Sequence, residues 1–260
     1  MPRFAADDIA PSPLGRVLAI AERLDTLAGG FAAGLKPTGN KDPFALRRNA
    51  LGLARTLLEG GFDLSLDDLL QRASAGVGTV GEGKGAGSAD VAEMKVFVID
   101  RLRAYYADQG VPPQQFEAVA TTWDGSLADF DARLRAIGEF AKLPEAGALA
   151  AANKRSRNIL KKVEGALPTA IDPALFAEDA ERELAAAVDA AIADTDPLLA
   201  QRDYVAVLGR LARLRPQVDA FFDQVMVNAD DPKIRDNRLA LLKRLSDRLG
   251  SVAAIEHLSI

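Results

Sequence analysis

The sequence predicts an all-α fold built of helical bundles, and three observations lead to this prediction. Of the 260 residues, 48% are hydrophobic but only 6% are aromatic, so the core must come mainly from Leu, Ala, Val and Ile. Leu and Ala are among the strongest helix formers. Apolar residues recur at helical spacing along most of the chain, whereas no segment alternates with a period of two over the length of a strand. We therefore expect no β-sheet.

Capping residues and glycine pairs define the helices expected in the first half. Side-chain oxygens of Ser and Asp accept hydrogen bonds from the free amides of a first turn, and Pro fits the first helical position because its missing N–H costs nothing there. These signals occur at Ser12–Pro13, Asp42–Pro43, Ser65, Pro112–Pro113 and Ser126, with glycine stops at Gly29–Gly30 and Gly60–Gly61. The expected helices cover residues 14–27, 43–59, 66–73, 91–109, 112–123 and 127–140.

The helix over residues 43–59 is expected to pack on the helix over residues 14–27, because the loop between them is too short for another element. Its apolar face consists of Leu46, Ala50, Leu53 and Leu57. Arg47 and Arg48 lie elsewhere on this helix. We expect them to be salt-bridged structural residues, with contact to RNA as the alternative.

The same signals continue in the second half. A long helix that is alanine-rich and then basic follows Pro144, and Asp172–Pro173 opens an acidic helix. Asp203 opens a long helix that is expected to kink at Pro216, whose ring displaces a backbone carbonyl. Asp231–Pro232 opens the last helix. The expected ranges are residues 144–167, 173–193, 203–227 and 232–249.

Residues 76–88 read GVGTVGEGKGAGS, and six of the twelve residues 76–87 are glycine. The run contains a G-x-G-x-x-G pattern, but a dinucleotide site needs a strand before the glycines, and a helical stretch precedes these. It also falls one residue short of a phosphate-binding loop, because Gly85 stands where Ser or Thr must hold Mg²⁺. We interpret the run as a mobile loop or linker.

The composition excludes several classes of site. The chain has no Cys and one His, His257, so disulfides and thiolate chemistry are excluded, and a catalytic triad or a two-His metal site is nearly so. Paired carboxylates such as Asp67–Asp68 and Asp230–Asp231 lie near helix starts, where capping explains them better than acid–base catalysis. We expect no catalytic residue and no metal ligand.

The sequence also predicts a cytoplasmic protein. No apolar run approaches the roughly 18 residues of a membrane span. The N-terminal segment carries Asp7 and Asp8 and lacks a basic region before an apolar core, so it does not resemble a signal peptide.

Residues 153–162 read NKRSRNILKK, with five positive charges and no acid in residues 154–162. One helix face would carry Lys154, Arg157, Asn158 and Lys161, flanked by Arg155 and Lys162. An unbalanced basic face attracts the phosphates of nucleic acids. We predict that these five cations contact the phosphate backbone of an RNA and that Asn153 and Asn158 hydrogen-bond bases or ribose.

The charges elsewhere are segregated, although the net charge is only −5. Residues 164–196 carry nine acids and one Arg, whereas residues 202–215 have a net charge of +3 and residues 233–248 of +4. Acids repel a phosphate backbone wherever it approaches wrongly, so segregated signs fit selective docking of RNA. Residues 233–248 are the weaker candidate for an RNA-binding surface, because the leucines of this stretch are expected to be buried in the core.

Five blocks of the chain resemble the β subunit of bacterial glycyl-tRNA synthetase. The longest is AERLDTLAGGFAAGLKPTGNKDPFALRRNALGLAR (Ala21–Arg55), and the others are MPRFA (Met1–Ala5), VFVIDRLRAYYADQGV (Val96–Val111), AAANKRSRNILKK (Ala150–Lys162) and FFDQVMVNADDPKIRDNRLALLKRL (Phe221–Leu245). The resemblance spans almost all of the chain, and the spacing of the blocks agrees. Because the family's chain is much longer, we expect this sequence to be its C-terminal part.

The resemblance implies a function. The family enzyme is an α2β2 ligase that charges tRNA(Gly) with glycine using ATP; its class II catalytic centre, with ATP and Mg²⁺, belongs to the α subunit, and the β subunit binds tRNA. The last block resembles a DALR-type anticodon-binding domain, which would extend from about Asn153 to Leu258. Its matching positions include Arg235, Asn237 and Arg238, which are candidates for secondary RNA contact or for a structural role. A region like the HD phosphohydrolases would lie upstream, and with His257 as the only His this chain cannot hold an HD metal site.

Together these observations predict four ranges: residues 1–75 as a helical segment, 76–89 as a Gly-rich linker, 90–150 as body helices and 151–260 as the DALR-like domain. The expected partners are tRNA(Gly) and the α subunit, without DNA or membrane, and no cofactor is expected on this chain. The alternative is a purely structural helical module that holds subunits together, with its basic helix paired to acids of a partner.

Overall fold

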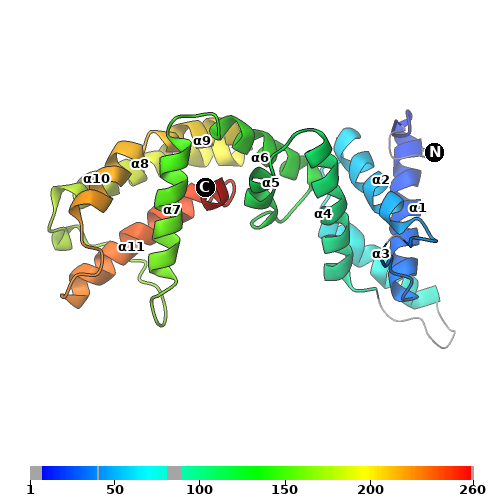
Figure 1. The fold of residues 1–260 in the computed structure, drawn as a ribbon, viewed down its shortest axis with the longest axis horizontal. Helices are drawn as coiled ribbons and strands as arrows, with labels where there is room; N and C mark the ends of the chain where they lie inside the picture. Colours follow the sequence, from blue (N-terminus) through cyan, green and yellow to red (C-terminus); the bar gives the residue numbers. More distant parts are fainter. Residues whose placement is uncertain (1–7, 40, 81–88, 259–260) are drawn as a thin grey trace. The chain divides into compact units, whose positions relative to one another are not determined.

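The computed structural model describes residues 8–39, 41–80 and 89–258. Within these ranges the chain forms helices and no strand, which confirms the all-α prediction (Figure 1). The helices are α1 (Pro13–Ala32), α2 (Leu46–Glu59), α3 (Leu66–Val80), α4 (Val91–Asp108), α5 (Pro113–Ala120), α6 (Leu127–Phe140), α7 (Ala146–Leu160), η1 (Pro173–Leu175), α8 (Asp179–Ala200), α9 (Tyr204–Ala212), α10 (Arg215–Gln224), α11 (Pro232–Leu249) and η2 (Ile255–Leu258). None of these described helices has both the length and the apolar character needed to cross a membrane.

Most of the predicted helix starts are confirmed by their capping hydrogen bonds. The Ser12 hydroxyl accepts a hydrogen bond from the Gly15 N–H at 3.1 Å. The Asp231 carboxylate accepts hydrogen bonds from two N–H groups in the first turn of α11. Asp42 also caps a helix, although from farther away than expected: its carboxylate accepts from the N–H groups of Leu46 and Arg47, where α2 begins.

Helix α1 does not stop at Gly29–Gly30 as predicted but continues to Ala32. The structure gives Gly30 a different role, because α2 approaches α1 closely at this residue. A Cβ atom at Gly30 would lie 2.9 Å from both methyl carbons of Leu46, a side chain that is completely buried, whereas a Cβ at Gly29 would meet nothing within 4 Å. Gly30 therefore serves helix packing rather than helix termination.

Several other boundaries differ from the predictions. α3 continues to Val80, so the first five residues of the expected Gly-rich linker are helical, and residues 81–88 lie outside the described ranges. α7 ends at Leu160, seven residues early. The single helix expected over residues 203–227 is two helices, because Pro216 lies in the first turn of α10, where proline fits, and not at a kink. The expected acidic helix is divided into η1 and α8.

The described chain forms two compact units, which do not coincide with the four ranges expected from the sequence. The first comprises the residues up to 113 together with residues 123–131. In it α2 packs against α1, as predicted, and also against α4, while α3 packs against α1 and α4. The fully buried side chains at its centre include Leu53, Leu57, Leu66 and Leu102.

The second unit comprises residues 114–122 and 132–260 and contains the region with the DALR-like resemblance. Helix α8 packs against α9, α10 and α11, and α7 packs against α10, α11 and η2. The core between them is made of completely buried apolar side chains such as Leu184, Val188, Phe221 and Leu242. This unit therefore fixes α7, the basic helix, on a rigid support.

Candidate nucleic-acid interface

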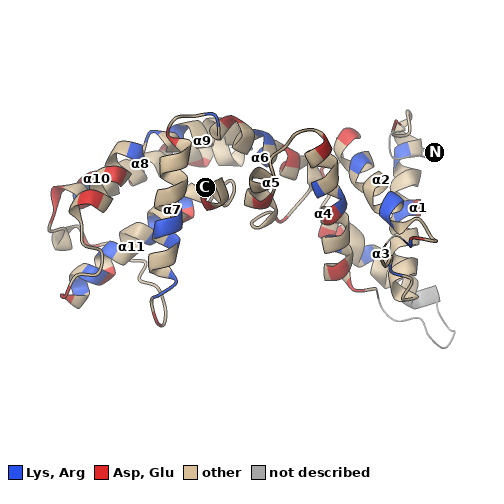
Figure 2. Cartoon of the chain, in the orientation of Figure 1, with Lys and Arg blue, Asp and Glu red and all other residues tan. Residues whose placement is uncertain are grey.

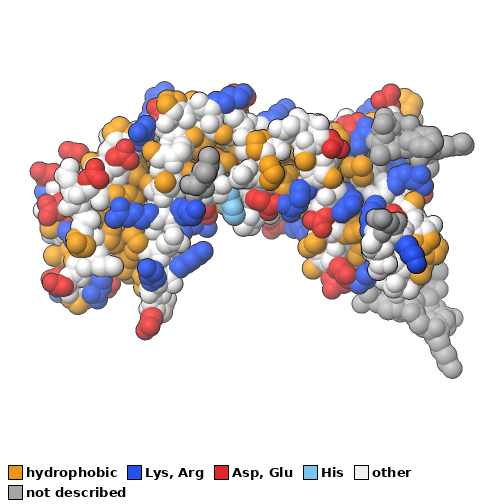
Figure 3. Space-filling view, viewed as in Figure 1, with side chains coloured by type: hydrophobic (Ala, Val, Ile, Leu, Met, Phe, Trp, Pro, Cys, Tyr) orange, Lys and Arg blue, Asp and Glu red, His pale blue; other side chains and the backbone are white. Residues whose placement is uncertain are grey.

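Helix α7 carries the basic residues that the sequence analysis singled out. Its packed side is lined by Leu149, Ala150, Asn153, Ser156 and Leu160. The opposite side is exposed to solvent and carries Lys154, Arg155 and Asn158, and the turn that follows the helix carries Lys161 and Lys162. Figure 2 marks Lys and Arg positions in the C-terminal half of α7, and Figure 3 shows Lys and Arg side chains in the same region of the surface. The predicted basic surface exists, but not all of the predicted residues belong to it.

Asn153 is a correction to the predicted surface, because its side chain is completely buried. Its Nδ2 donates a hydrogen bond to Glu256 Oε2 at 2.9 Å, and its Oδ1 accepts one from Ser246 Oγ at 2.9 Å. One residue before Lys154, it is rotated about 100° around the helix axis, toward the packed side. Asn153 therefore ties α7 to α11 and η2 and is not available to RNA.

Arg157 lies at one edge of the exposed side, where it is partly neutralised. Its Nε lies 2.9 Å from Glu256 Oε1, an ion-pair distance without the alignment of a hydrogen bond, and its side chain is 37% exposed. The side chain of Glu256 is only 15% exposed and also accepts the hydrogen bond from Asn153. A phosphate would have to compete with this carboxylate, so Arg157 is a weaker candidate for RNA contact than the sequence suggested.

Arg155 lies at the other edge, next to α10. Its guanidinium carbon is 4.4 Å from the centroid of the Phe222 ring, a cation–π contact between the two helices. Arg155 is exposed and Phe222 is half-buried, so the pair lies at the surface of the unit.

Lys154, Asn158, Lys161 and Lys162 lie between these two edges and are all exposed. Within the described ranges, no ion pair and no side-chain hydrogen bond engages any of the four. Lys161 is the C-cap residue of α7, and the partial negative charge of a helix C-terminus stabilises cations there. These lysines are therefore free to pair with phosphates at little structural cost.

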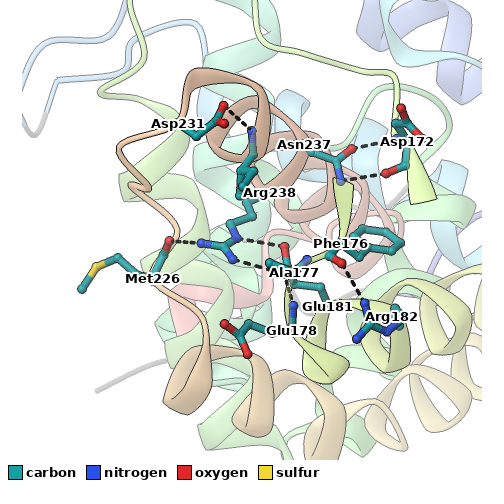
Figure 4. Close-up of polar contacts among 11 residues, drawn as sticks. Asp172, Phe176, Ala177, Glu178, Glu181, Arg182, Met226, Asp231, Asn237 and Arg238 are labelled. Carbon is teal, nitrogen blue, oxygen red and sulfur yellow. Dashed lines mark hydrogen bonds and ion pairs between the residues drawn. The ribbon is translucent and has the colours of Figure 1, made fainter. Parts of the chain in front are cut away.

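The candidates Asn237 and Arg238 of α11 have structural roles (Figure 4). Arg238 is 6% exposed; its Nε donates to Glu181 Oε1 at 2.8 Å and its Nη1 donates to the Met226 carbonyl at 2.8 Å. The side chain of Asn237 donates to the carbonyl of Asp172 and accepts from its N–H. Burial and full engagement exclude both from direct RNA contact in this structure.

The Glu181 carboxyl is fully buried in this network. Burial on its own raises the pKa of Glu181, but hydrogen bonds from Arg238 and from the N–H groups of Glu178 and Ala177 outweigh it and hold the pKa below its ordinary value. The pair of Glu181 and Arg238 is therefore charged in the folded protein. It joins α8 to α11 and fixes the backbone at Met226.

The remaining candidates lie outside this cluster. Arg235 donates to the carbonyl of Ala229 at 3.3 Å, which closes the turn before α11. In the first unit, Arg47 donates to the carbonyl of Gly39 at 2.7 Å in place of the expected ion pair, and Arg48 is exposed on α2.

Two residues of the interface were missed by the sequence analysis: Glu256, which neutralises part of Arg157, and Phe222, which holds Arg155. Both are more than 60 residues from α7 in the sequence, so only the fold brings them to it. The helical period of α7 could have predicted the burial of Asn153, because Asn153 lies on the same side of the helix as Ala146, Leu149 and Leu160. In the described ranges, no cluster of three or more His, Asp or Glu side chains could hold a metal ion.

Two parts of the chain match known protein families. Residues 1–121 match the family model described as glycyl-tRNA synthetase beta subunit, and residues 149–255, which include α7, match the DALR anticodon binding domain. The chain is 66% identical over 260 residues to the glycine–tRNA ligase beta subunit of Xanthomonas campestris pv. campestris strain B100, covering 99% of this chain and 37% of that protein. It is 52% identical over 284 residues to the subunit of the same name from Xylella fastidiosa strain Temecula1, covering 99% of this chain and 39% of that protein. The chain thus spans less than two fifths of the length of these curated relatives.

Proposed function

Because this chain belongs to the glycyl-tRNA synthetase β-subunit family, we propose that it is a tRNA-binding, non-catalytic portion of glycine–tRNA ligase. In this proposal the exposed side of α7 binds the phosphate backbone of tRNA(Gly) near its anticodon. ATP, Mg²⁺ and the chemistry of glycine activation belong to the α subunit of an α2β2 enzyme, which acts in the cytoplasm.

The observation that carries the proposal is the set of unpaired lysines on α7, within the region that matches the anticodon-binding model. Lys154, Lys161 and Lys162 are exposed, and no carboxylate in the described ranges neutralises them. Phosphate contacts of this kind position an RNA without reading its sequence. Bases of a single-stranded loop, such as an anticodon loop, then supply the sequence-specific contacts.

The supporting electrostatics come from the rest of the second unit. Helix α8 has an excess of acidic residues, although Asp189, Asp194 and Asp196 are ion-paired with arginines, whereas the lysines of α7 have no carboxylate partner among the described residues. An RNA that approaches with its backbone on α8 is therefore disfavoured relative to one that docks on α7. This arrangement fits a selective RNA-binding surface on a chain whose net charge is negative.

A titration of the purified chain against two RNAs tests the proposal. One is tRNA(Gly), and the other is the same tRNA with its anticodon replaced. We expect the chain to bind tRNA(Gly) more tightly, by about tenfold or more, since each lost base contact costs about 1–3 kcal/mol at a single-stranded site. Fluorescence anisotropy at a fixed salt concentration measures both affinities. Equal affinity for the two RNAs would contradict anticodon recognition, and binding to neither would favour the structural module as the role of this chain.

A further inference from the structure

We propose that Arg155 and Phe222 form a shelf on which one unpaired base of the bound RNA loop stacks, with Asn158 beside it to hydrogen-bond the edge of that base. This inference rests on the proposed function, and it assigns Arg155 a role different from the phosphate contact expected from the sequence. It also brings Phe222, a residue of α10, into the RNA-binding surface.

The geometry of the pair supports stacking. The guanidinium carbon of Arg155 lies over the Phe222 ring, 4.4 Å from its centroid, so the ring holds this planar group at the surface between α7 and α10. Arg155 remains exposed, which leaves the guanidinium accessible to a further flat group. Unstacked bases of RNA loops stack on aromatic rings and on arginine guanidinium planes. A guanidinium already held by a ring loses little conformational freedom when a base stacks on it.

The charge around the pair favours a base over a phosphate. Asp223 follows Phe222 directly and is exposed, and Asp219 lies one turn earlier on the same helix, where Arg215 approaches it at 3.3 Å. A phosphate placed over Phe222 would meet the negative charge of Asp223, whereas the face of a base carries no net charge. The phosphates are therefore expected on the lysine side of α7, and a base on the α10 side.

The neighbours of Arg155 on α7 complete the site. Asn158 lies three residues after Arg155, the spacing at which side chains on a helix surface are neighbours. Its amide is exposed and, within the described part of the chain, makes no hydrogen bond with another residue. An amide can donate and accept at once, which suits the edge of a base. Lys154 and Lys161 lie on the far side of Asn158 and can hold the phosphates of the same loop.

Two conservative variants separate stacking from charge and from folding. Arg155→Lys keeps the positive charge but removes the planar group, and Phe222→Leu keeps an apolar side chain but removes the ring. Asn158→Ala tests the edge contact, and Lys154→Ala is the matched control that removes one charge without touching the shelf. Thermal unfolding followed by circular dichroism shows whether each variant is folded. Because Arg155 is exposed, Arg155→Lys is expected to stay folded. It therefore still tests the shelf if Phe222→Leu unfolds.

The measurement uses tRNA(Gly) transcripts that each carry one 2-aminopurine in the anticodon loop. The control RNA, called the closed hairpin, has the same stem, but the bases of its loop are paired. We expect binding to quench the fluorescence at one loop position, since stacking quenches this base. Arg155→Lys and Phe222→Leu should each abolish that quenching and weaken binding of tRNA(Gly) about tenfold, without weakening binding of the closed hairpin. Lys154→Ala should weaken binding of both RNAs equally and leave the quenching intact.

The outcomes distinguish this inference from the proposed function. If the unmodified chain binds tRNA(Gly) and both shelf variants keep its affinity and quenching, the shelf is wrong and the proposed function stands. If the shelf variants weaken binding of the closed hairpin as much as that of tRNA(Gly), Arg155 contacts phosphate and the shelf is again wrong. If the unmodified chain binds no tRNA, both proposals fail.

Discussion

Two carboxylates, the buried Glu181 and the largely buried Glu256, decide which basic and amide side chains of the second unit are available to a partner. Glu256 engages Asn153 and Arg157, and Glu181 engages Arg238. An ionised carboxylate inside a protein needs hydrogen bonds and an opposite charge to offset its desolvation, so each of these draws polar groups inward. The lysines of α7 have no such partner among the described residues and stay in solvent.

The Glu181–Arg238 pair leads to a prediction about stability and pH. Replacing Glu181 by Gln leaves the buried Arg238 without its counter-charge and should destabilise the chain by about 3–5 kcal/mol at neutral pH. Because the folded-state pKa of Glu181 is lowered from 4.5, its stabilising effect is present above about pH 4.5 and is lost as the pH falls through the lower, folded-state pKa. The difference in unfolding free energy between the two proteins should therefore narrow below pH 4.5.

Urea unfolding from pH 7 to pH 3 measures that difference. Glu183→Gln is the matched control, since Glu183 is exposed on the same helix. It should leave the unfolding free energy within about 0.5 kcal/mol of the parent at neutral pH. A Glu181→Gln difference that stays constant down to pH 3 would show that the charge of Glu181 does not support the fold.

The sequence predicted the basic surface of α7 but not which residues belong to it. The charge run at residues 154–162 was sufficient to find the exposed lysines, because an unbalanced run on a helix has few local partners. It could not show that Glu256 would neutralise Arg157, since that contact joins residues 99 positions apart and depends on how η2 packs on α7. For the same reason the sequence left both an RNA contact and a structural role open for Asn237 and Arg238, and the fold gives both a structural role.

Among the elements, the two glycines of α1 have different roles although they are adjacent. A Cβ at Gly30 would press on Leu46 of α2, whereas a Cβ at Gly29 would meet open space. Gly29→Ala should therefore stabilise the chain by about 0.5–1 kcal/mol, since alanine loses less backbone entropy in a helix. Gly30→Ala gains the same amount but forces the buried Leu46 to move, at a cost of about 1–3 kcal/mol, and should be net destabilising.

The two single variants are controls for each other, because they change the same residue type in the same helix. Thermal or urea unfolding of both measures the difference directly. If the two variants changed stability by the same amount, the close approach of α2 at Gly30 would be wrong.

The same pair of helices shows what sequence patterns can and cannot define. Apolar spacing correctly predicted that α2 packs on α1 and that Leu53 is buried, because that pattern depends only on the helical period. It could not place the end of α1, because a glycine that terminates a helix and a glycine that admits a neighbouring helix look alike in sequence. Pro216 was misread in the same way, since a proline opens a helix as readily as it kinks one.

For the molecule as a whole, we propose a tRNA-binding module that works with a catalytic centre on the α subunit. We therefore predict that the purified chain catalyses no glycine-dependent ATP–pyrophosphate exchange, because activation is proposed to take place on the α subunit. A complete glycine–tRNA ligase, assayed at the same concentration, is the positive control. ATP–pyrophosphate exchange by the chain alone, clearly above a buffer blank, would contradict the proposal that glycine activation takes place on the α subunit.

We propose that the exposed lysines of α7 bind the tRNA backbone, and the salt dependence of tRNA(Gly) binding is the decisive test of this proposal. The measurement compares the parent chain with Lys154→Ala/Lys161→Ala and with Lys41→Ala/Arg72→Ala, a control that removes two exposed cations from the first unit. Each phosphate contact adds about 0.7–0.9 to the slope of log affinity against log salt concentration. The α7 variant should therefore lose about 1.5 from this slope, with folding intact, whereas the control should keep it. An unchanged slope in the α7 variant, or an equal loss in the control, would contradict the claim.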